Sequence, residues 1–520
     1  MRRAFQFSIS PAATTPALLT GVATCLVAAW IGENVAGQPP PSTVIIGARV
    51  ADGTGGPLTR QNVRIVGDSI AAVGSFEAQS ADAVVRAEGL VVAPGFIDVH
   101  NHSSEGLLEK DSLATSQISQ GITTVVLGPD GSSPWPIKDY FDTLRERPVT
   151  LNTLMTVGHA TVRRRVMGDD YKRAATADEV VRMKALVQQG FEDGAVGLSS
   201  GLEYEVGGYA TTDEVVELAT VAAKYGGFYT SHIRDEADKA FDAMRELIEI
   251  GERAHLPVQN THIKLGTVGV WHKAPEAVKL VADARARGLD VTADCYPYDA
   301  WHSTITVLVP NKQYADRTSV DRGLADVGGA ENVTITECKA HPDFEGQTLA
   351  ALAQAKHTTA ADIFIQVVKD GGAGVIAKSM VDDDIELFYK QSWVMVGSDG
   401  GIGMRHPRAA GTFPRVLGRF VRDRKWLTLE NAVRKMTSLP AERLKMTDRG
   451  LVRAGMKADL VLFNPDTIVD RSTFAEPDLV ATGVEKVWVN GVPVWSNGQA
   501  TGARPGRPLP RSVAGPTRAR

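Results

Sequence analysis

The chain has 520 residues, of which 43% are hydrophobic and 22% are charged. This is an ordinary globular composition, and it argues against a disordered or fibrous protein. The formal net charge of -5 is spread along the chain without long blocks of one sign. Nucleic acid or an anionic membrane is therefore not expected as the main partner. The length allows a large core in one or two domains.

Residues 1–42 have the composition of a targeting segment and a linker. Arg2 and Arg3 precede the apolar stretch 17–31, and small residues at 35–37 come before a proline run. The apolar stretch is shorter than the roughly 20 residues that span a bilayer. We therefore expect a cleaved export signal, no stable membrane span, and a periplasmic or secreted protein. An uncleaved amphiphilic tail is the alternative interpretation.

The most informative motif is a histidine pair at the end of an apolar run. Residues 91–99 form that run, and His100-Asn101-His102 follows it. Side chains alternate along a strand, so the imidazoles of His100 and His102 point the same way and can bind one metal ion. The pair alone is weak evidence, because two surface or core histidines would look the same.

Three more ligand-type residues follow β-prone runs elsewhere in the chain. His232, His262 and Asp399 each come directly after, or end, such a run. Imidazole and carboxylate groups suit zinc or a related divalent ion. The pattern therefore predicts a metal site built from several strand ends.

The central part of the chain alternates β-prone runs with amphipathic helices, which predicts a parallel sheet of βαβ units. One such helix is expected over 176–192, behind a capping box of Thr176 and Glu179. Eight units match an α/β fold of the (β/α)₈ TIM-barrel type over 94–446, with an insertion at about 303–390. The eight runs are 95–100, 123–128, 151–158, 195–200, 227–232, 257–262, 290–296 and 393–398.

The two flanks of the barrel are rich in short alternating strands and turn residues. Segments 43–93 and 447–497 are expected to pair into one small β-sandwich, and 498–520 reads as a disordered tail. Cys295 and Cys338 are the only cysteines outside the expected export signal. Two cysteines define no disulfide framework, so we expect buried thiols.

From roughly Thr43 to Pro493 the chain resembles the amidohydrolase superfamily, and within it the N-acyl-D-amino-acid deacylases (D-aminoacylases). The motifs that carry the resemblance are Gly-Phe-Ile-Asp-Val-His-Asn-His at 95–102, Ser-Ser-Gly-Leu-Glu-Tyr at 199–204, Ser-His-Ile-Arg-Asp-Glu at 231–236, Thr-His-Ile-Lys at 261–264, Tyr-Pro-Tyr at 296–298, Gly-Ser-Asp-Gly at 397–400, His-Pro-Arg at 406–408 and Gly-Thr-Phe-Pro-Arg at 411–415.

The resemblance implies a hydrolase that splits N-acyl-D-amino acids, or dipeptides with a D residue, into a carboxylic acid and a free amino acid. It implies one or two divalent ions, zinc above all, and Asp399 as general acid and base. The implied metal ligands are His100, His102, Asp130, His232, His262 and Asp399. The implied substrate contacts are Tyr204 near the reacting carbonyl, with Lys264, Tyr296, Ser303 and Arg408 at the carboxylate.

One position departs from the family. D-aminoacylases usually place a metal-bridging cysteine in a Gly-Asn-Cys-Gly turn after the second strand, whereas this chain has Asp130 in Gly-Pro-Asp-Gly. A carboxylate still binds zinc, but it weakens the preference for zinc over other divalent ions. The identity and number of the ions stay open. Lys264, two residues after His262, could instead be a carbamylated bridging group.

Two other functions remain open from the sequence. A cyclic-amide hydrolase of the dihydroorotase or hydantoinase kind would share the barrel and the metal. Its usual carbamylated lysine after strand four has no counterpart near Ser199 or Ser200. A non-catalytic scaffold with this fold would have no need of Asp399 aimed at a metal. The sequence does not predict the acyl chain, the amino-acid side chain or the oligomeric state.

Each singled-out residue also has a structural interpretation. Lys264 and Arg408 could form structural ion pairs, and Tyr204 and Tyr296 could be core aromatics. His159, at the expected end of strand three, could support the metal site from behind or simply pack in a loop.

Overall fold

The structure is a computed structural model that describes residues 42–511. The expected export signal, except for Ser42, and the last nine residues of the expected tail lie outside this range. Within it, the chain begins directly in a β-strand at Ser42.

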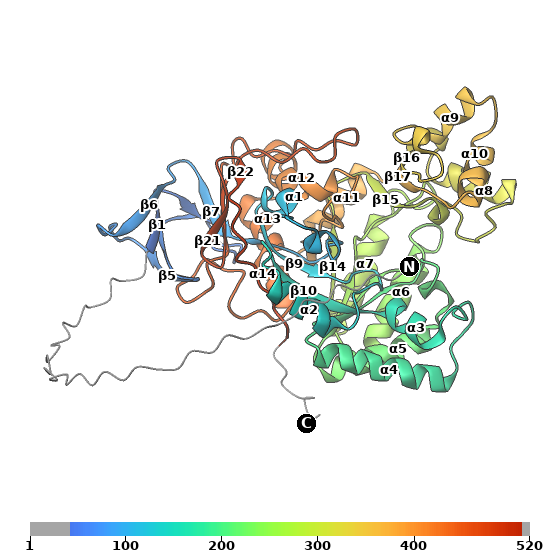
Figure 1. The fold of residues 1–520 in the computed structure, drawn as a ribbon, viewed down its shortest axis with the longest axis horizontal. Helices are drawn as coiled ribbons and strands as arrows, with labels where there is room; N and C mark the ends of the chain where they lie inside the picture. Colours follow the sequence, from blue (N-terminus) through green and yellow to red (C-terminus); the bar gives the residue numbers. More distant parts are fainter. Residues whose placement is uncertain (1–41, 512–520) are drawn as a thin grey trace, which may run out of the picture. The chain divides into compact units, whose positions relative to one another are not determined.

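A parallel barrel forms the centre of the described chain (Figure 1). All eight predicted strands are present and pair with their sequence neighbours in order. They are β8 (Phe96–Asp98), β9 (Ile122–Leu127), β10 (Asn152–Gly158), β11 (Gly197–Gly201), β12 (Phe228–His232), β13 (Val258–Asn260), β14 (Val291–Cys295) and β18 (Val394–Val396). The fold-class prediction is confirmed.

The barrel closes just beyond the carboxyl ends of its first and last strands. Asn101 pairs with Gly400 in a parallel bridge. The amide of Asp399 donates to the carbonyl of His100 at 3.0 Å, and the amide of His102 donates to that of Gly400 at 2.7 Å. The residues of two predicted motifs, 300 positions apart in the chain, therefore lie side by side.

Helices cover the outside of the barrel. The Thr176 hydroxyl accepts from the Glu179 amide, and both halves of the predicted capping box are present. The helices are α1 (Thr115–Ile118), α2 (Ile137–Glu146), α3 (His159–Met167), α4 (Ala177–Glu192), α5 (Thr212–Lys224), α6 (Ala240–Ala254), α7 (Ala274–Ala286), α11 (Asp382–Lys390), α12 (Arg408–Arg415), the π-helix η6 (Val416–Asp423), α13 (Leu429–Met436) and α14 (Ser438–Arg443), with 3₁₀ turns η1 (Gly106–Leu108) and η2 (Gly207–Tyr209).

The insertion between β14 and β18 is a small unit with its own antiparallel sheet, drawn in yellow in Figure 1. It contains β15 (Ala300–Thr304), η3 (Ile305–Leu308), α8 (Arg317–Asp326), η4 (Ala330–Asn332), β16 (Val333–Glu337), η5 (Pro342–Phe344), α9 (Leu349–Ala355), α10 (Ala360–Lys369) and β17 (Gly374–Lys378). The sheet thus starts at Ala300, slightly before the predicted boundary, while α11 packs on α7 and β18 as a barrel helix.

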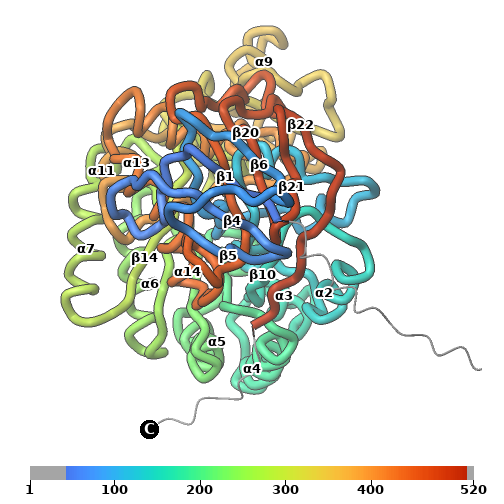
Figure 2. Tube along the Cα trace, turned by 90° about the vertical axis from the view of Figure 1, so that its left-hand side faces the viewer, coloured from blue at the N-terminus to red at the C-terminus, as the bar shows by residue number. Residues whose placement is uncertain are grey.

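Two further sheets bring the flanks of the barrel together (Figure 2). Their facing sides enclose a core that includes Ile65, Val92, Leu462 and Trp488, which is the arrangement of a β-sandwich. One sheet is β5 (Ser69–Gly74), β4 (Asn62–Val66), β1 (Ser42–Ile46) and β6 (Asp82–Arg86); the other is β22 (Gln499–Ala500), β21 (Val492–Ser496), β20 (Val484–Val489), β19 (Leu460–Phe463), β7 (Val91–Pro94), β2 (Arg49–Val50) and β3 (Thr59–Arg60).

The prediction of a disordered tail from residue 498 is wrong as far as Arg511. The amide of Gly506 donates to Val149, that of Leu509 donates to Thr153, and that of Arg511 donates to Gly194. Its prolines suggested an unstructured segment, but backbone hydrogen bonds to the barrel hold it.

Cys295 and Cys338 are buried free thiols, as predicted. No helix in residues 42–511 is both long and apolar enough to cross a bilayer.

Candidate metal centre

Two imidazole nitrogens at the carboxyl end of the barrel lie 3.0–3.4 Å from each other and from two carboxylate oxygens. The Nε2 atoms of His100 and His102 are 3.3 Å apart. Asp399 Oδ1 is 3.3 Å from the first and 3.0 Å from the second, and Asp130 Oδ2 is 3.3 and 3.4 Å from them. A tetrahedral zinc ion with bonds of about 2.0–2.1 Å separates its ligands by about 3.3 Å. These four atoms therefore fit one divalent ion.

A second group of donors adjoins the first. His232 Nδ1 and His262 Nε2 are 3.0 Å apart, and Asp130 Oδ1 is 3.7 Å from His262 Nε2. This carboxylate oxygen is buried and has no hydrogen-bond partner within residues 42–511. Asp130 can thus bridge two ions, one at each oxygen. Three protein ligands at the second position would leave a coordination site open, as catalytic zinc sites do.

Three of these ligands have a left-handed backbone. The φ angles of Asp130, His262 and Asp399 are 54°, 36° and 49°, a region that residues with a Cβ adopt at a cost. The turn of Asp130 also requires a glycine at position 201, because a Cβ on Gly201 would lie 2.5 Å from the Asp130 carbonyl oxygen. The turns after the strands thus aim these side chains at the centre of the barrel.

The charges of the site hold both carboxylates in the ionised form. Burial alone would raise the pKa of Asp399, but Arg408 and His100 hold it well below its usual range. Burial would also raise the pKa of Asp130, but His100 and His102 outweigh this effect and lower the pKa of the carboxyl. Ionised carboxylates are the form that binds a cation.

Carboxylates that the sequence analysis did not single out hold the ligands from behind. Glu203 Oε2 lies 2.6 Å from His232 Nε2, and Glu236 Oε1 lies 3.1 Å from His262 Nδ1. Asp294 Oδ1 accepts from the His262 amide at 2.9 Å and lies 3.6 Å from His100 Nδ1. Such partners fix the ring orientation of a metal-binding histidine.

The predicted substrate contacts Arg408 and Lys264 lie in the site, but each already faces a carboxylate. Arg408 NH1 is 2.8 Å from Asp399 Oδ2, and Lys264 Nζ is 2.6 Å from Glu236 Oε2. Burial opposes the charge on Lys264, but Glu236 outweighs it and raises the pKa of the ammonium. A permanently charged ammonium is not the form that takes up carbon dioxide, so this pair disfavours a carbamylated Lys264.

Two buried donors in the same place are free within residues 42–511. The Tyr296 hydroxyl and Arg408 Nε have no hydrogen-bond partner there, and the guanidinium lies 4.9 Å from the centre of the Tyr296 ring. Leaving buried donors unpaired costs free energy. A bound anion, such as a substrate carboxylate, would pair them.

Ser303 and Tyr204 line an open cavity in front of the metal ligands. The Tyr204 ring lies 4.4 Å from the ring of His232. Burial raises the pKa of Tyr204 well above its usual value, with Asp130 adding to the effect, so its hydroxyl stays protonated and able to donate. The insertion completes the cavity with Val307, Leu308 and Val327.

His159 does not reach the metal centre. Its Nε2 lies 2.9 Å from Glu214 Oε1, and the other oxygen of Glu214 pairs with Arg163. All three side chains are buried. They join α3 to α5 as a structural network, so the packed-histidine interpretation describes His159.

Comparison with known proteins agrees with this geometry. A sequence profile described as "Amidohydrolase family" matches residues 83–495. The chain belongs to the amidohydrolase family. This amidohydrolase is 36% identical over 500 residues to the D-aminoacylase of Alcaligenes xylosoxydans xylosoxydans, covering 91% of this chain and 99% of that protein.

A second relative from the same organism, N-acyl-D-glutamate deacylase, is 37% identical over 498 residues, covering 91% of this chain and 97% of its own. Among solved structures, N-acyl-D-glutamate deacylase from Bordetella bronchiseptica, with zinc and a phosphonate inhibitor, superposes with a TM-score of 0.82. It is 34% identical, and the match covers 91% of this chain and 100% of that one. The amidohydrolase therefore shares both the fold and the family that its motifs predicted.

Proposed function

We propose that this amidohydrolase is a metal-dependent deacylase that hydrolyses N-acyl-D-amino acids to a carboxylic acid and a free D-amino acid. The observation that carries the proposal is the close set of His100, His102, Asp130 and Asp399 donors beside the buried donors of Arg408 and Tyr296. The first set fits a divalent ion, and the second fits the carboxylate of an amino acid. The substrates of the relatives support this assignment.

Asp399 is placed to move the protons of amide hydrolysis. A bound divalent ion supplies a nucleophile at neutral pH by lowering the pKa of water, and it polarises the substrate carbonyl. Asp399 would accept the proton of the attacking water and deliver it to the departing nitrogen. Tyr204, which stays protonated, would donate a hydrogen bond to the oxygen that becomes negative.

Arg408 would anchor the carboxylate of the substrate. Its planar guanidinium can bind a carboxylate through two parallel hydrogen bonds, and Tyr296 adds a third donor. Arg408 would then contact Asp399 and the substrate at once, which fixes the distance between the general base and the amide. Lys264, paired with Glu236, contributes positive charge at longer range.

The cavity favours a neutral amino-acid side chain over an acidic one. Among the lining residues that the structure describes, Lys264 is the only lysine or arginine, and Glu236 already pairs with it. Glu203 and Asp326 add negative charge, and Val307 and Leu308 supply apolar surface. Like charges in a partly buried site repel strongly. We therefore expect N-acyl-D-leucine to be a better substrate than N-acyl-D-glutamate.

A cyclic-amide hydrolase is less well supported. The fourth strand ends with Ser200 and Gly201, and the Ser200 hydroxyl bonds to Tyr229 and Ser231, so no lysine is present to be carbamylated there. A scaffold without activity has no use for a charged Asp399 facing the histidines. We further propose export from the cytoplasm, supported by the sequence of residues 1–42 and testable by cell fractionation.

The test is a screen of N-acetyl-D- and N-acetyl-L-amino acids with zinc, manganese and cobalt supplied in turn. The proposal predicts release of the free D-amino acid, fastest for apolar side chains. Hydrolysis of L substrates only would contradict the D preference, and hydrolysis of dihydroorotate or hydantoins alone would favour the cyclic-amide function.

A further inference from the structure

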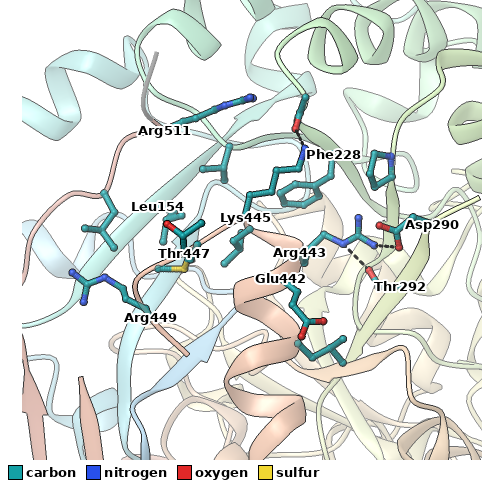
Figure 3. Close-up of a pocket in the computed structure, with 18 of the residues that line it drawn as sticks. Leu154, Phe228, Asp290, Thr292, Glu442, Arg443, Lys445, Thr447, Arg449 and Arg511 are labelled. Carbon is teal, nitrogen blue, oxygen red and sulfur yellow. Dashed lines mark hydrogen bonds and ion pairs between the residues drawn. The ribbon is translucent and has the colours of Figure 1, made fainter. Parts of the chain in front are cut away.

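A second cavity lies at the opposite end of the barrel from the metal centre (Figure 3). It is open to solvent and has a volume of about 800 Å³. Its wall includes Phe228 at the start of β12, Asp290 just before β14 and Trp393 just before β18. The metal ligands lie at the other ends of these strands. The proposed deacylase chemistry therefore does not use this cavity.

Two segments from the end of the chain cover this side of the barrel. The first is the connection after α14, which carries Lys445, Met446 and Arg449, and the second is segment 508–511, at the end of the described residues. Figure 3 shows Arg443, Lys445 and Arg511 around the cavity, with Lys445 extending past Phe228 and Arg443 pointing to Asp290 and Thr292. The chain end is held by its backbone bonds to Thr153 and Gly194.

The cavity carries an excess of positive charge. Six of its lining residues are lysine or arginine, and three are aspartate or glutamate. Arg443 donates to Asp290 at 2.9 Å and to Thr292 at 3.1 Å. Lys445 and Arg511, by contrast, have no carboxylate partner within residues 42–511.

The two cations without a carboxylate lie at the same spot. Lys445 Nζ and Arg511 NH2 are each 3.3 Å from the position that a Cβ on Gly226 would take. Lys445 donates to the Gly226 carbonyl at 2.8 Å, and Arg511 NH1 is buried without a partner in the described chain. Burial lowers the pKa of Lys445, and the charges of Arg511 and Arg443 lower it further. An anion between them would relieve this repulsion.

Part of the wall is apolar. Leu154, Phe228 and Leu444 belong to one buried hydrophobic cluster, and Met446 and Leu509 pack on it while remaining partly exposed. Such a surface beside cations matches a ligand with an apolar body and one negative end. Residues 512–520 include two arginines and no acidic side chain, so they do not complement the charge of the cavity.

We propose that this cavity binds an amphiphilic organic anion, with a carboxylate or phosphate head at Lys445 and Arg511 and an apolar body against Phe228 and Leu444. The site is formed by the barrel floor together with the chain end, and it is separate from the metal centre. Occupation would tie the chain end to the barrel through the head group, so it raises the melting temperature as well.

Isothermal titration calorimetry of the full-length, zinc-loaded protein tests the proposal, with decanoate, decyl phosphate, decanol, acetate and inorganic phosphate as probes. The expected result is saturable binding of decanoate, decyl phosphate or both with a Kd below about 1 mM. Decanol lacks the charge, and acetate and inorganic phosphate lack the apolar body, so each should bind at least about tenfold more weakly. Binding of the two decyl anions should weaken as salt is added.

The variants Lys445→Glu and Arg511→Glu should each raise the Kd of the decyl anions at least about tenfold. Lys110→Glu is the matched control, because Lys110 is exposed and does not line the cavity. Thermal melting of all three variants checks that they fold. Equal affinity of the wild type, Lys445→Glu and Arg511→Glu would place the ligand elsewhere, for instance at the metal centre, and would overturn the proposal. Absence of saturable binding, or equally tight decanol, would overturn it too.

Discussion

Arg408 and Asp399 form a buried ion pair, with NH1 and Oδ2 2.8 Å apart. Asp399 follows the last barrel strand and faces the histidines, while Arg408 begins α12 and lies against Tyr296. The pair keeps the carboxylate charged and the guanidinium fixed. It also places the proposed proton acceptor next to the proposed substrate anchor.

Arg408→Met tests this anchoring role. It should lower kcat/KM for an N-acetyl-D-amino acid by about 10²-fold, because a charge-assisted bidentate contact is lost. The matched substrate is the corresponding amino-acid amide, which has no carboxylate and should lose far less. Steady-state kinetics on both substrates measures the difference, and equal losses would show that Arg408 acts only through Asp399.

Asp399→Asn removes the proton acceptor with little change in shape. We expect kcat to fall about 10²–10⁴-fold, as for the loss of a general base. The four histidines and Asp130 remain, so metal analysis should still find bound zinc. Activity within a few fold of the wild type would rule Asp399 out as the general base.

Asp130→Cys exchanges a hard ligand for a soft one. The thiolate should raise the preference for zinc over manganese, because soft ligands favour zinc. Competition between the two metals, read from the metal content after dialysis, measures the ratio of the affinities. An unchanged ratio would mean that Asp130 does not contact the ion.

Glu203 is expected to position His232 and not to touch the substrate. Glu203→Gln should weaken zinc binding about 10–100-fold, the usual effect of losing a carboxylate behind a metal-binding histidine. Excess zinc should then restore kcat, which a role in substrate binding would not allow. Glu205→Gln is the control, because Glu205 is exposed and pairs with Lys172.

Lys435, which is not part of the metal centre, should make the free energy of unfolding depend on pH. Burial, with a smaller contribution from Arg434, lowers its pKa to about 7 in the folded protein, against about 10.4 in an unfolded chain. Between these values the unfolded state binds more protons, so the stability rises with pH. The slope contributed by one such group is up to about 1.4 kcal/mol per pH unit, and Lys435→Met should remove it. Denaturant unfolding of both proteins from pH 7 to 10 measures it, and parallel slopes would contradict the shift.

The barrel was predictable because its signals are local. Each strand lies in a short β-prone run, and helix α4 begins at a capping box that is visible in the sequence. The order of parallel βαβ units then brings His100, His232 and Asp399 to one rim. Predicting the ligands thus needed only their place after a strand.

The carboxylates behind the ligands could not be predicted in the same way. Glu203 stands beside Tyr204 in a motif that was recognised, but its contact with His232 depends on how the loop after β11 folds back. Glu236 lies four residues after His232, and this spacing alone is only weak evidence that a carboxylate contacts a metal-binding histidine. Segment 506–511 had no local signal, because its backbone bonds to Val149, Thr153 and Gly194 join residues more than 300 positions apart.

The most direct test of the metal-dependent mechanism is a titration of the metal-free protein with zinc while the release of D-leucine from N-acetyl-D-leucine is followed. The account predicts no release without metal, a rise with the first equivalents of zinc, and no rise in a His232→Ala, His262→Ala double variant. Full activity of the metal-free protein, or a normal response of the double variant, would contradict it.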